Sequence, residues 1–178
     1  MNLFFRLLRV RLLSRFRPRC SVLGPVRTPF RVLPTDLDVL RHVNNGVYLS
    51  LMDLARVDLM IRSGLLGPLR ERGWYPVVAA ETIRFRRSLE LFQRFAVETR
   101  VVGWDERVFF VHQRFLRGDD VVAAAFVAAR FLRRGGTVPP AEVLELAGLD
   151  PAPPPPPEWA RRLARAQGGL PAERGRGA

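Results

Sequence analysis

Four strand-like segments follow one another after residue 76 with no helical pattern between them, and this order limits the fold more than any other feature. Residues 77–87 alternate between two sets of side chains, as a strand with two different faces does. Residues 95–103 and 107–117 follow. Residues 121–132 are almost continuously apolar, which predicts a central strand buried on both faces. Consecutive strands without helices between them predict an antiparallel sheet in an α+β fold.

One strand and one long helix precede these segments. Residues 26–33 suit an edge strand that ends at Pro34, and residues 47–62 have helical spacing up to a stop at Gly64. Apolar residues occupy most of the circumference of this helix, so it should be largely buried, as a helix wrapped by a sheet would be. Asp58 and Arg62, four residues apart, should add on the order of a few tenths of a kcal/mol.

The stretch from Thr35 to Tyr48 carries the side chains with the most chemistry. It places two acids, a histidine and paired asparagines directly before the helix. Asn44 or Asn45 is expected to cap the helix, whose first backbone N–H groups can hold an oxyanion. A carboxylate a few residues upstream could attack a carbonyl polarised there, or activate water against it, which suits acyl transfer. The alternative is a capped loop whose polar residues only satisfy the backbone.

The same stretch resembles a known family. The pattern Asp-x-Asp-x-x-x-His-Val-Asn-Asn-x-x-Tyr-Leu over residues 36–49 resembles the motif of hotdog-fold acyl thioesterases of the 4-hydroxybenzoyl-CoA thioesterase type. Its flanks, with matches at residues 64–70, 86–89 and 100–105, are similar to the thioesterase-superfamily-member (THEM-type) branch. The resemblance covers roughly residues 30–135. It implies a hotdog fold, an antiparallel sheet wrapped around a long central helix, and the order of strands and helix predicts the same architecture independently.

The resemblance also implies roles for individual residues. Asp38, the second acid of the pattern, would attack the thioester carbonyl or activate the attacking water. The backbone N–H of Asn45 would stabilise the oxyanion, and Asp36 would fix the loop by accepting backbone N–H bonds. Tyr48 belongs to the same pattern and is assigned to substrate binding. A thiol leaving group needs less acid assistance than an alkoxide, so no general acid is required.

His42 has two interpretations. Related acyl carrier protein thioesterases use the matching histidine in their site, which makes His42 a catalytic candidate. In this chain, however, Leu40 stands where that pattern has Asn, and Arg41 replaces the Gly usual before His-Val-Asn-Asn. The alternative is a structural histidine, hydrogen-bonded within the loop.

Charged residues of the segment 77–87 and of residues 133–134 are further candidates for the site. Glu81 lies on the apolar face of the segment, where a carboxylate has a raised pKa unless it is paired. It is either a second acid–base group at a dimer interface or the buried partner of an arginine. The basic candidates could bind the phosphates of coenzyme A or form a solvated face; they are Arg84, Arg86, Arg87, Arg133 and Arg134.

Length and composition predict one domain with two extensions. The 178 residues allow one domain with a substantial core at residues 25–137, after a basic arm at 1–24 and before a Pro-rich extension with short helices at 138–178. Within that extension, residues 153–157 predict a polyproline spacer and residues 158–167 a last short helix. One cysteine, Cys20, and two histidines argue against an intramolecular disulfide or a metal site, and no cofactor is predicted.

Basic residues are concentrated in the arm. The chain has 29 basic residues, all of them arginine, against 17 acids, and eight of the arginines precede Asp36, the first acid. Residues 1–19 mix arginine with Leu and Phe, and their apolar runs are too short for a transmembrane helix or a secretory signal. Three interpretations stay open: a membrane-surface arm, an arm folded onto the domain, or a disordered extension. Because the basic excess lies outside the domain, nucleic-acid binding is not predicted.

Together these features predict a cytoplasmic thioester hydrolase, held at the inner face of the membrane if the arm binds lipid. The expected substrate is an acyl-CoA or acyl carrier protein thioester with a fatty or aromatic acyl group. The alternative is an acyl-thioester binding or membrane-scaffold protein of hotdog fold with little turnover. The apolar segment 121–132 and a site shared between subunits predict a homodimer or a dimer of dimers.

Overall fold

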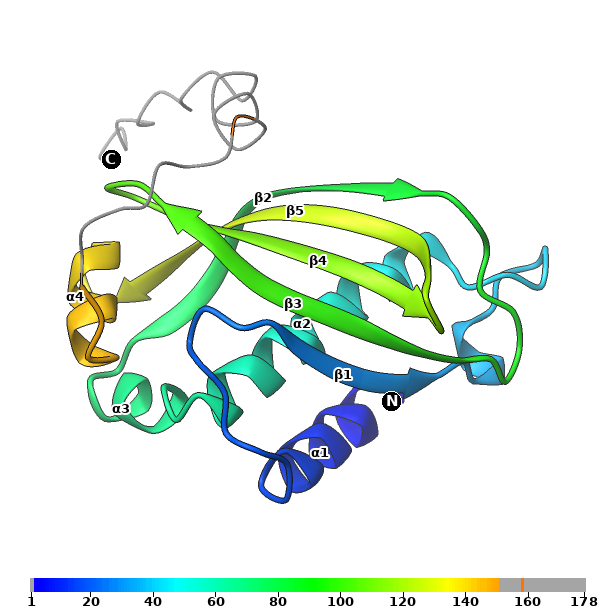
Figure 1. Ribbon diagram of the computed structural model, residues 1–178, viewed down its shortest axis with the longest axis horizontal. Coiled ribbons are helices and arrows are strands. Elements are labelled where there is room, and N and C mark those ends of the chain that lie inside the picture. The colour runs from blue at the N-terminus through cyan, green and yellow to red at the C-terminus, as the bar shows by residue number, and fades with distance from the viewer. Residues whose placement is uncertain (1, 151–157, 159–178) are drawn as a thin grey trace, which may run out of the picture.

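The strands form one curved antiparallel sheet, seen in a computed structural model that describes residues 2–150 and Glu158 (Figure 1). Their bounds are β1 Val26–Arg31, β2 Tyr75–Phe85, β3 Arg94–Trp104, β4 Phe109–Arg117, β5 Asp120–Arg133 and β6 Gly136–Val138. The hydrogen-bonded order is β1-β3-β4-β5-β2, with β6 beside β5. Every pair is antiparallel, which confirms the predicted sheet; the short β6 was not predicted.

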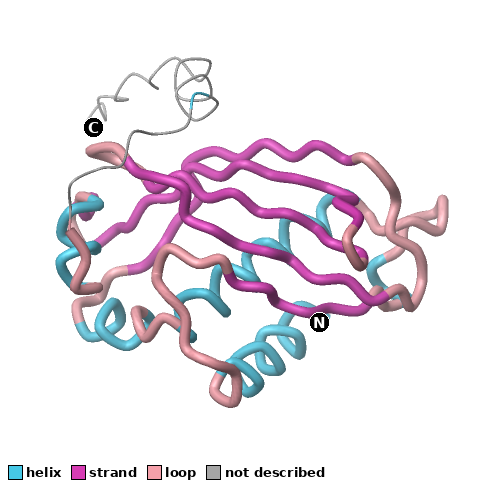
Figure 2. The backbone as a smooth tube through the Cα atoms, viewed as in Figure 1, coloured by secondary structure: helices cyan, strands magenta, loops and turns pink. Residues whose placement is uncertain are grey.

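Helix α2 (Asn45–Arg62) is the predicted central helix, and the sheet curves around it (Figures 1 and 2). Its residues Leu51, Met52 and Ala55 are almost completely buried, and they belong to the same core cluster as Val97 and Phe115 of the sheet. Full burial of a side chain the size of Leu or Met contributes roughly 1.5–3 kcal/mol. The packing of α2 against the sheet is therefore the main apolar contact that holds the fold together.

Strand β5 lies inside the sheet, between β4 and β2. Ala123, Ala125 and Ala129 are buried at alternate positions on the face toward α2, and such small side chains leave room for a helix to pack closely. On the opposite face Phe126 is only partly buried and Arg130 is exposed, so the prediction of burial on both faces is wrong for that face. Because β5 is internal, the long outer strands of the sheet within residues 2–150 are β1 and β2, and the short β6 is a further outer strand beside β5.

Residues 2–14 form helix α1 (Asn2–Ser14), which packs against α2 beside β1 (Figure 1). Val10 and Ser14 on its inner side are only 5% and 3% exposed. Of the three interpretations of the arm, the structure shows the one in which it folds onto the domain.

Asp58 joins α1, α2 and β1 at a buried junction. The hydroxyl groups of Ser14 and Thr28 each donate to its carboxylate at 2.6 Å, and the guanidinium groups of Arg17 and Arg62 lie at 3.3 and 3.7 Å. The expected pair with Arg62 is present, but Asp58 is completely buried. The few tenths of a kcal/mol applies to an exposed pair, whereas removal of one partner of a buried pair costs about 3–5 kcal/mol.

Two short helices close the end of the sheet at which α2 ends. They are α3 (Leu66–Glu71) and α4 (Pro140–Leu146), the second of which lies in the extension for which short helices were predicted. They contribute Leu69, Val143 and Leu144 to a second apolar cluster with Trp104 and Phe131. The predicted polyproline spacer and the last helix, residues 153–157 and 158–167, lie outside the described residues apart from Glu158.

Candidate active site

The loop between the 3-10 turn η1 (Pro34–Asp36) and α2 is a narrow hairpin. Leu37 and Val43 form an antiparallel bridge, and the Asp38 N–H donates to the His42 carbonyl at 2.9 Å. Arg41 closes the turn with φ +62° and donates its N–H to the Asp38 carbonyl at 3.0 Å. This is the left-handed region that glycine favours, so Arg41 keeps the backbone conformation expected of the Gly it replaces.

Asp36 fixes the base of this hairpin. It is 3% exposed and accepts the Leu33 N–H at 2.8 Å and the Arg6 guanidinium at 2.5 Å. Its carbonyl accepts the Asn44 N–H at 2.8 Å. These contacts confirm that Asp36 fixes the loop by accepting a backbone N–H.

Asp38 is held differently. It is partly buried, and one carboxylate oxygen, Oδ1, accepts the N–H groups of Leu40 at 2.9 Å and His42 at 3.3 Å. No hydrogen bond from the described residues reaches the second oxygen, Oδ2. The carboxylate is thus oriented by the turn and keeps one oxygen for another partner.

The first turn of α2 leaves one backbone donor unused. Asn44 is the cap, because its side-chain oxygen accepts the Gly46 N–H at 2.8 Å and its carbonyl accepts the Val47 N–H at 2.9 Å. The Asn44 N–H itself is bound to Asp36. Within the described part of the chain the Asn45 N–H has no acceptor. A free N–H at a helix N-terminus, where the helix dipole is positive, favours a developing negative charge.

His42 and Tyr48 flank this site at different depths. The His42 side chain is exposed, and the loop hydrogen bonds of this residue are made by its backbone rather than its imidazole. The Tyr48 ring is 2% exposed and contacts the rings of Phe85 and Phe115. Burial raises the pKa of its hydroxyl, while a hydrogen bond with the backbone of Leu89 acts in the opposite direction. The structure therefore places Tyr48 in the core beneath the site.

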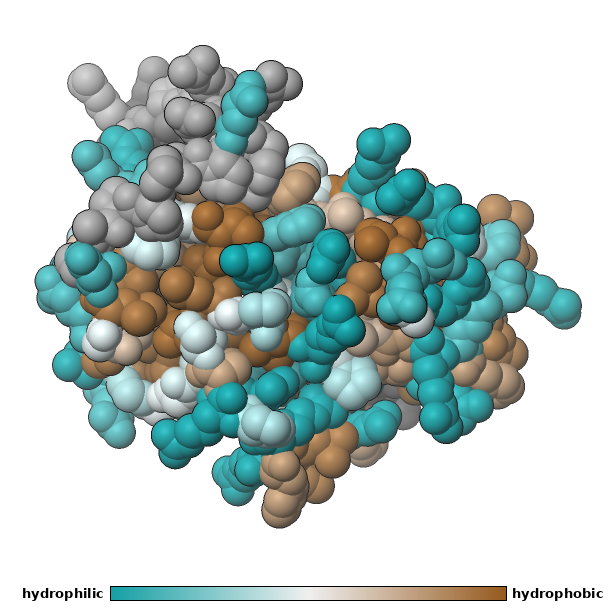
Figure 3. Space-filling model, in the orientation of Figure 1, coloured by the Kyte–Doolittle hydropathy of each residue, from teal (hydrophilic) through white to brown (hydrophobic). Residues whose placement is uncertain are grey.

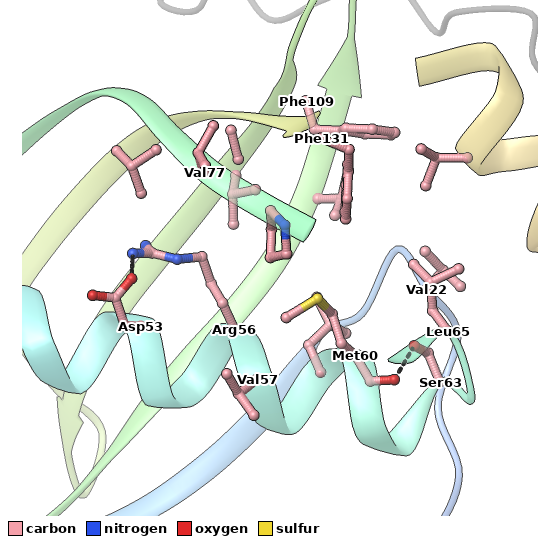
Figure 4. A pocket seen from close by; sticks show the side chains of 17 residues that line it. Val22, Asp53, Arg56, Val57, Met60, Ser63, Leu65, Val77, Phe109 and Phe131 are labelled. Atoms are coloured by element: carbon pink, nitrogen blue, oxygen red, sulfur yellow. Dashed lines mark hydrogen bonds and ion pairs between the residues drawn. The ribbon is translucent and has the colours of Figure 1, made fainter. Parts of the chain in front are cut away.

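A cavity of about 280 Å³ lies between α2 and the sheet (Figure 4). Its wall is almost entirely apolar, and Met60 of α2 faces Val77 and Phe131 of the sheet across it. The cavity lies along the C-terminal part of α2. A rise of about 1.5 Å per residue places Arg56 about 16 Å along the helix from Asn45. Within one chain, the Asp38 hairpin and this cavity therefore belong to opposite ends of α2.

A polar cluster borders the cavity at Arg56. The guanidinium of Arg56 donates to Asp53 and to the buried Gln113, each at 2.5 Å, and Glu81 lies 4.0 Å away. The Gln113 side chain donates in turn to Thr99 at 2.9 Å. Burial raises the pKa of Glu81; Arg56 opposes this shift and Asp53 adds to it. Glu81 thus lies beside an arginine, as one of its two interpretations predicted, yet its Oε2 accepts no hydrogen bond from residues 2–150.

The arginines that were candidates for binding the phosphates of coenzyme A lie away from the cavity. Arg84 and Arg86 line a shallow depression of about 550 Å³ with Phe126, on the face of the sheet opposite α2. Arg87 is paired with Asp120 at 2.8 Å, and Arg133 with Glu142 at 3.0 Å. The structure therefore does not bring these arginines to the cavity.

Sequence reasoning missed the participation of Arg56 and Gln113. Arg56 lies between Asp53 and Asp58 in α2, and Gln113 shares one face of β4 with the buried residues Val111 and Phe115. An isolated polar side chain on a buried face was the available signal, because such a group needs a partner.

Comparison with known proteins places these features in a family. Residues 32–163 match the model of the thioesterase-like superfamily. The chain is 45% identical over 98 residues to Protein THEM6 of Xenopus laevis, covering 54% of this chain and 47% of that protein. It is 37% identical over 135 residues to Protein THEM6 of Danio rerio, covering 71% of this chain and 65% of that protein. The chain thus spans about half to two thirds of the length of these relatives.

A solved structure agrees with the sequence relatives. A thioesterase from Thermus thermophilus, complexed with coenzyme A and Zn, superposes with a TM-score of 0.60 at 28% identity. The match covers 69% of this chain and 97% of that one. The match to the family model covers most of the chain, and the sheet wrapped around α2 is the hotdog architecture of thioesterases. The chain belongs to the thioesterase-like superfamily, with the hotdog fold.

Proposed function

We propose that this protein hydrolyses an acyl thioester at the N-terminus of α2. One observation carries the proposal: Asp38 keeps a carboxylate oxygen uncommitted, while the Asn45 N–H, at the start of the helix that follows the same hairpin, has no acceptor among the described residues. A carboxylate and an oxyanion donor are the two groups that thioester hydrolysis requires.

The chemistry can follow either of two routes. In the first, Asp38 takes a proton from water as the water oxygen bonds to the carbonyl carbon. The carbonyl electron pair moves to the oxygen, where the Asn45 N–H stabilises it. The tetrahedral intermediate then collapses, the C–S bond breaks, and the thiolate takes the proton. In the second, an Asp38 oxygen bonds to the carbonyl carbon, the thiolate leaves, and water hydrolyses the mixed anhydride.

Isotope labelling can identify the anhydride route. A single turnover in water enriched in ¹⁸O places the label in the released acid if water attacks the thioester directly or attacks the acyl carbonyl of the anhydride. It places the label in the Asp38 carboxylate if an anhydride forms and water attacks the aspartyl carbonyl. Mass spectrometry of the peptide that contains Asp38 distinguishes these outcomes.

The acyl group is proposed to be apolar, fatty or aromatic. The cavity beside α2 is lined by apolar side chains, which favour a hydrocarbon over a charged group. Coenzyme A or acyl carrier protein is the proposed carrier, and the similar Thermus protein, complexed with coenzyme A, supports the first of these.

A homodimer is proposed to complete the site. In one chain the Asp38 hairpin and the cavity lie at opposite ends of α2. β2 has a free edge, along which Tyr75, Val78 and Phe85 are exposed. Antiparallel pairing of two β2 edges about a twofold axis would bring the N-terminus of one α2 toward the cavity of its partner. The internal position of β5 removes this strand as the pairing edge.

The test is a hydrolysis panel of acyl-CoA and acyl carrier protein thioesters of increasing chain length, with wild type and Asp38→Asn. Turnover by wild type and its loss in Asp38→Asn would support the proposal. Tight binding without turnover, unchanged in Asp38→Asn, would support the alternative of a thioester-binding or scaffold protein. Sedimentation velocity at micromolar concentration tests the dimer, and a pure monomer would contradict it.

A further inference from the structure

Helix α1 presents one fixed face to the outside. Its inner side is tied to the domain by the Arg6–Asp36 pair at one end and by the Ser14–Asp58 hydrogen bond at the other, with Val10 buried between them. Both acids are themselves buried. The helix therefore cannot turn its inner side outward without breaking these contacts, and the outer side is a permanent part of the surface.

That outer side is apolar. Exposed side chains recur every four residues, and Phe4, Leu8 and Leu12 are 67%, 55% and 56% exposed. Residues at this spacing lie in line along one face of a helix. Phe16, 81% exposed, extends the line just past the helix end. Figure 3 shows apolar atoms gathered at the lower edge of the molecule, over α1. We call these four residues the outer stripe.

Arginines surround the outer stripe. Arg9 and Arg11 of α1, and Arg15 directly after its end, are exposed and have no acidic partner among the described residues. Arg9 and Arg31 also line a groove of about 210 Å³ between α1 and β1. The same two residues and Arg94 line an adjoining hollow. An apolar stripe bordered by unpaired cations complements the headgroup region of an anionic bilayer, where the apolar side chains enter and the cations meet phosphate.

We propose that α1 is an interfacial helix that docks this protein, through its outer stripe, on an anionic membrane surface. At about 1.5 Å per residue its 13 residues extend about 20 Å, which suits a helix lying in the membrane plane. None of the helices within residues 2–150 has the length and apolar character needed to cross a bilayer. Arg6 binds Asp36, two residues before Asp38, so docking would hold the reactive hairpin close to the lipid surface. The proposal does not depend on catalysis.

The test measures binding of the full chain to vesicles of phosphatidylcholine alone and of phosphatidylcholine with about 30% phosphatidylglycerol. Wild type should sediment with the anionic vesicles, and about 0.5 M NaCl should weaken this binding. Phe4→Gln/Leu8→Gln/Leu12→Gln should lower the partition coefficient roughly tenfold or more. Arg9→Gln/Arg11→Gln/Arg15→Gln should lower it roughly 10²-fold. The matched control, Arg70→Gln/Arg107→Gln/Arg134→Gln, removes as many exposed charges elsewhere and should bind close to wild type.

Thermal unfolding of each variant confirms that the fold is kept, since all substituted side chains are exposed and glutamine is a good helix former. Should the stripe variant unfold, Phe16→Gln, which lies beyond the helix, tests the same face alone. Failure of wild type to bind anionic vesicles would overturn the proposal, and so would equal binding by the stripe variant or an equal loss in the matched control. A fall in sedimenting mass of the stripe variant without lipid would identify a second copy of the chain as the occupant and overturn it as well.

Discussion

The two ends of helix α2 have different surroundings, polar at the N-terminal end and apolar at the C-terminal end. At the N-terminal end polar groups are exposed or half-buried, and the Asp38 hairpin is held by backbone hydrogen bonds. At the C-terminal end the helix borders an apolar cavity whose wall is made by side chains from the sheet. A reactive group needs polar neighbours that orient it, whereas an acyl chain needs a dry wall. Because the two regions are separate, we expect substitutions at the N-terminal end to change the reaction rate and substitutions at the cavity to change acyl binding.

The two carboxylates that face these regions differ in the same way. Asp38 has two backbone donors on one oxygen and leaves the other for a partner. Glu81 Oε2 lies 4.0 Å from Arg56 and accepts no hydrogen bond from the described residues, and burial raises the pKa of Glu81. The comparison favours Asp38 as the reactive group in the proposed hydrolysis and leaves Glu81 as a group whose charge is costly.

The largest expected effect is on chemistry at the N-terminal end. Asp38→Asn should lower kcat for thioester hydrolysis by roughly 10²- to 10⁴-fold, because an amide neither attacks nor takes a proton. The melting temperature should stay close to wild type. Asp119→Asn, an exposed aspartate in the β4–β5 turn, is the matched control and should keep its activity. Comparable turnover in Asp38→Asn and the control would remove Asp38 from the mechanism.

The next effect separates the two aspartates of the hairpin. Asp36→Asn should lower the free energy of unfolding by about 2 kcal/mol, because it weakens charge-assisted hydrogen bonds and leaves Arg6 without its partner. Turnover by the folded fraction should fall less than in Asp38→Asn. Urea denaturation followed by circular dichroism gives the stability, and an assay below the unfolding midpoint gives the turnover. If Asp36→Asn abolishes turnover and Asp38→Asn does not, the two roles are reversed.

A change at the cavity should alter acyl preference and leave the chemistry intact. Ala129→Leu adds bulk to the cavity wall, and each methylene it excludes should lower kcat/KM for long acyl chains roughly fourfold. Short acyl chains should react as before. Ala124→Leu, on the opposite face of β5, is the control and should leave the length preference unchanged. A loss of equal size at every chain length would show that the acyl chain does not enter this cavity.

A smaller effect should appear in the pH dependence of stability. Because burial raises the pKa of Glu81 above its ordinary value of 4.5, the protonated form is favoured in the native state. The protonated Glu81 side chain therefore stabilises the folded protein at pH values below 4.5. This stabilisation is lost as the pH rises through the raised pKa of Glu81. Glu81→Gln should remove this decline and stabilise the protein at pH 7 by about 1 kcal/mol or less. Unfolding free energies measured at several pH values test this.

Glu98→Gln is the control with the opposite sign. Burial alone would raise the pKa of Glu98, but hydrogen bonds from Arg114 and Arg27 hold it below its ordinary value. Its stabilising effect is therefore present above that ordinary value and is lost as pH falls through the lowered pKa. Glu98→Gln should reduce stability at neutral pH. Identical pH profiles for the two variants would contradict both assignments.

The smallest effect concerns the turn of the hairpin. Arg41 adopts φ +62°, which costs an L-residue energy that glycine does not incur, although glycine also loses more entropy on folding. Arg41→Gly should therefore stabilise the protein by about 0.5 kcal/mol or less and leave turnover unchanged. Thermal unfolding and the standard hydrolysis assay measure both. A large loss of turnover would show that the Arg41 side chain, rather than the backbone of the turn, serves the site.

Local patterns in the sequence were sufficient for the elements that depend on neighbouring residues. The cap of α2 at Asn44 and the positions of the strands along the chain follow from side chains within a few positions of one another. The placement of Asp36 and Asp38 in a loop before the helix was likewise predictable. Helix propensity, capping and turn chemistry act over that range, so a single sequence carries them completely.

Contacts between distant residues were decided only by the tertiary structure. Arg56 and Gln113 are 57 positions apart, and Ser14 and Asp58 are 44 apart, so no local periodicity relates them. The sequence left the arm with three interpretations because its arginines could face lipid, water or the domain. In the structure the arm packs on the domain because two buried carboxylates require partners. Helix α1 supplies Arg6 to Asp36 and Ser14 to Asp58. The free edge of β2 is equally a property of the assembled sheet, because an edge exists only once the order of its strands is set.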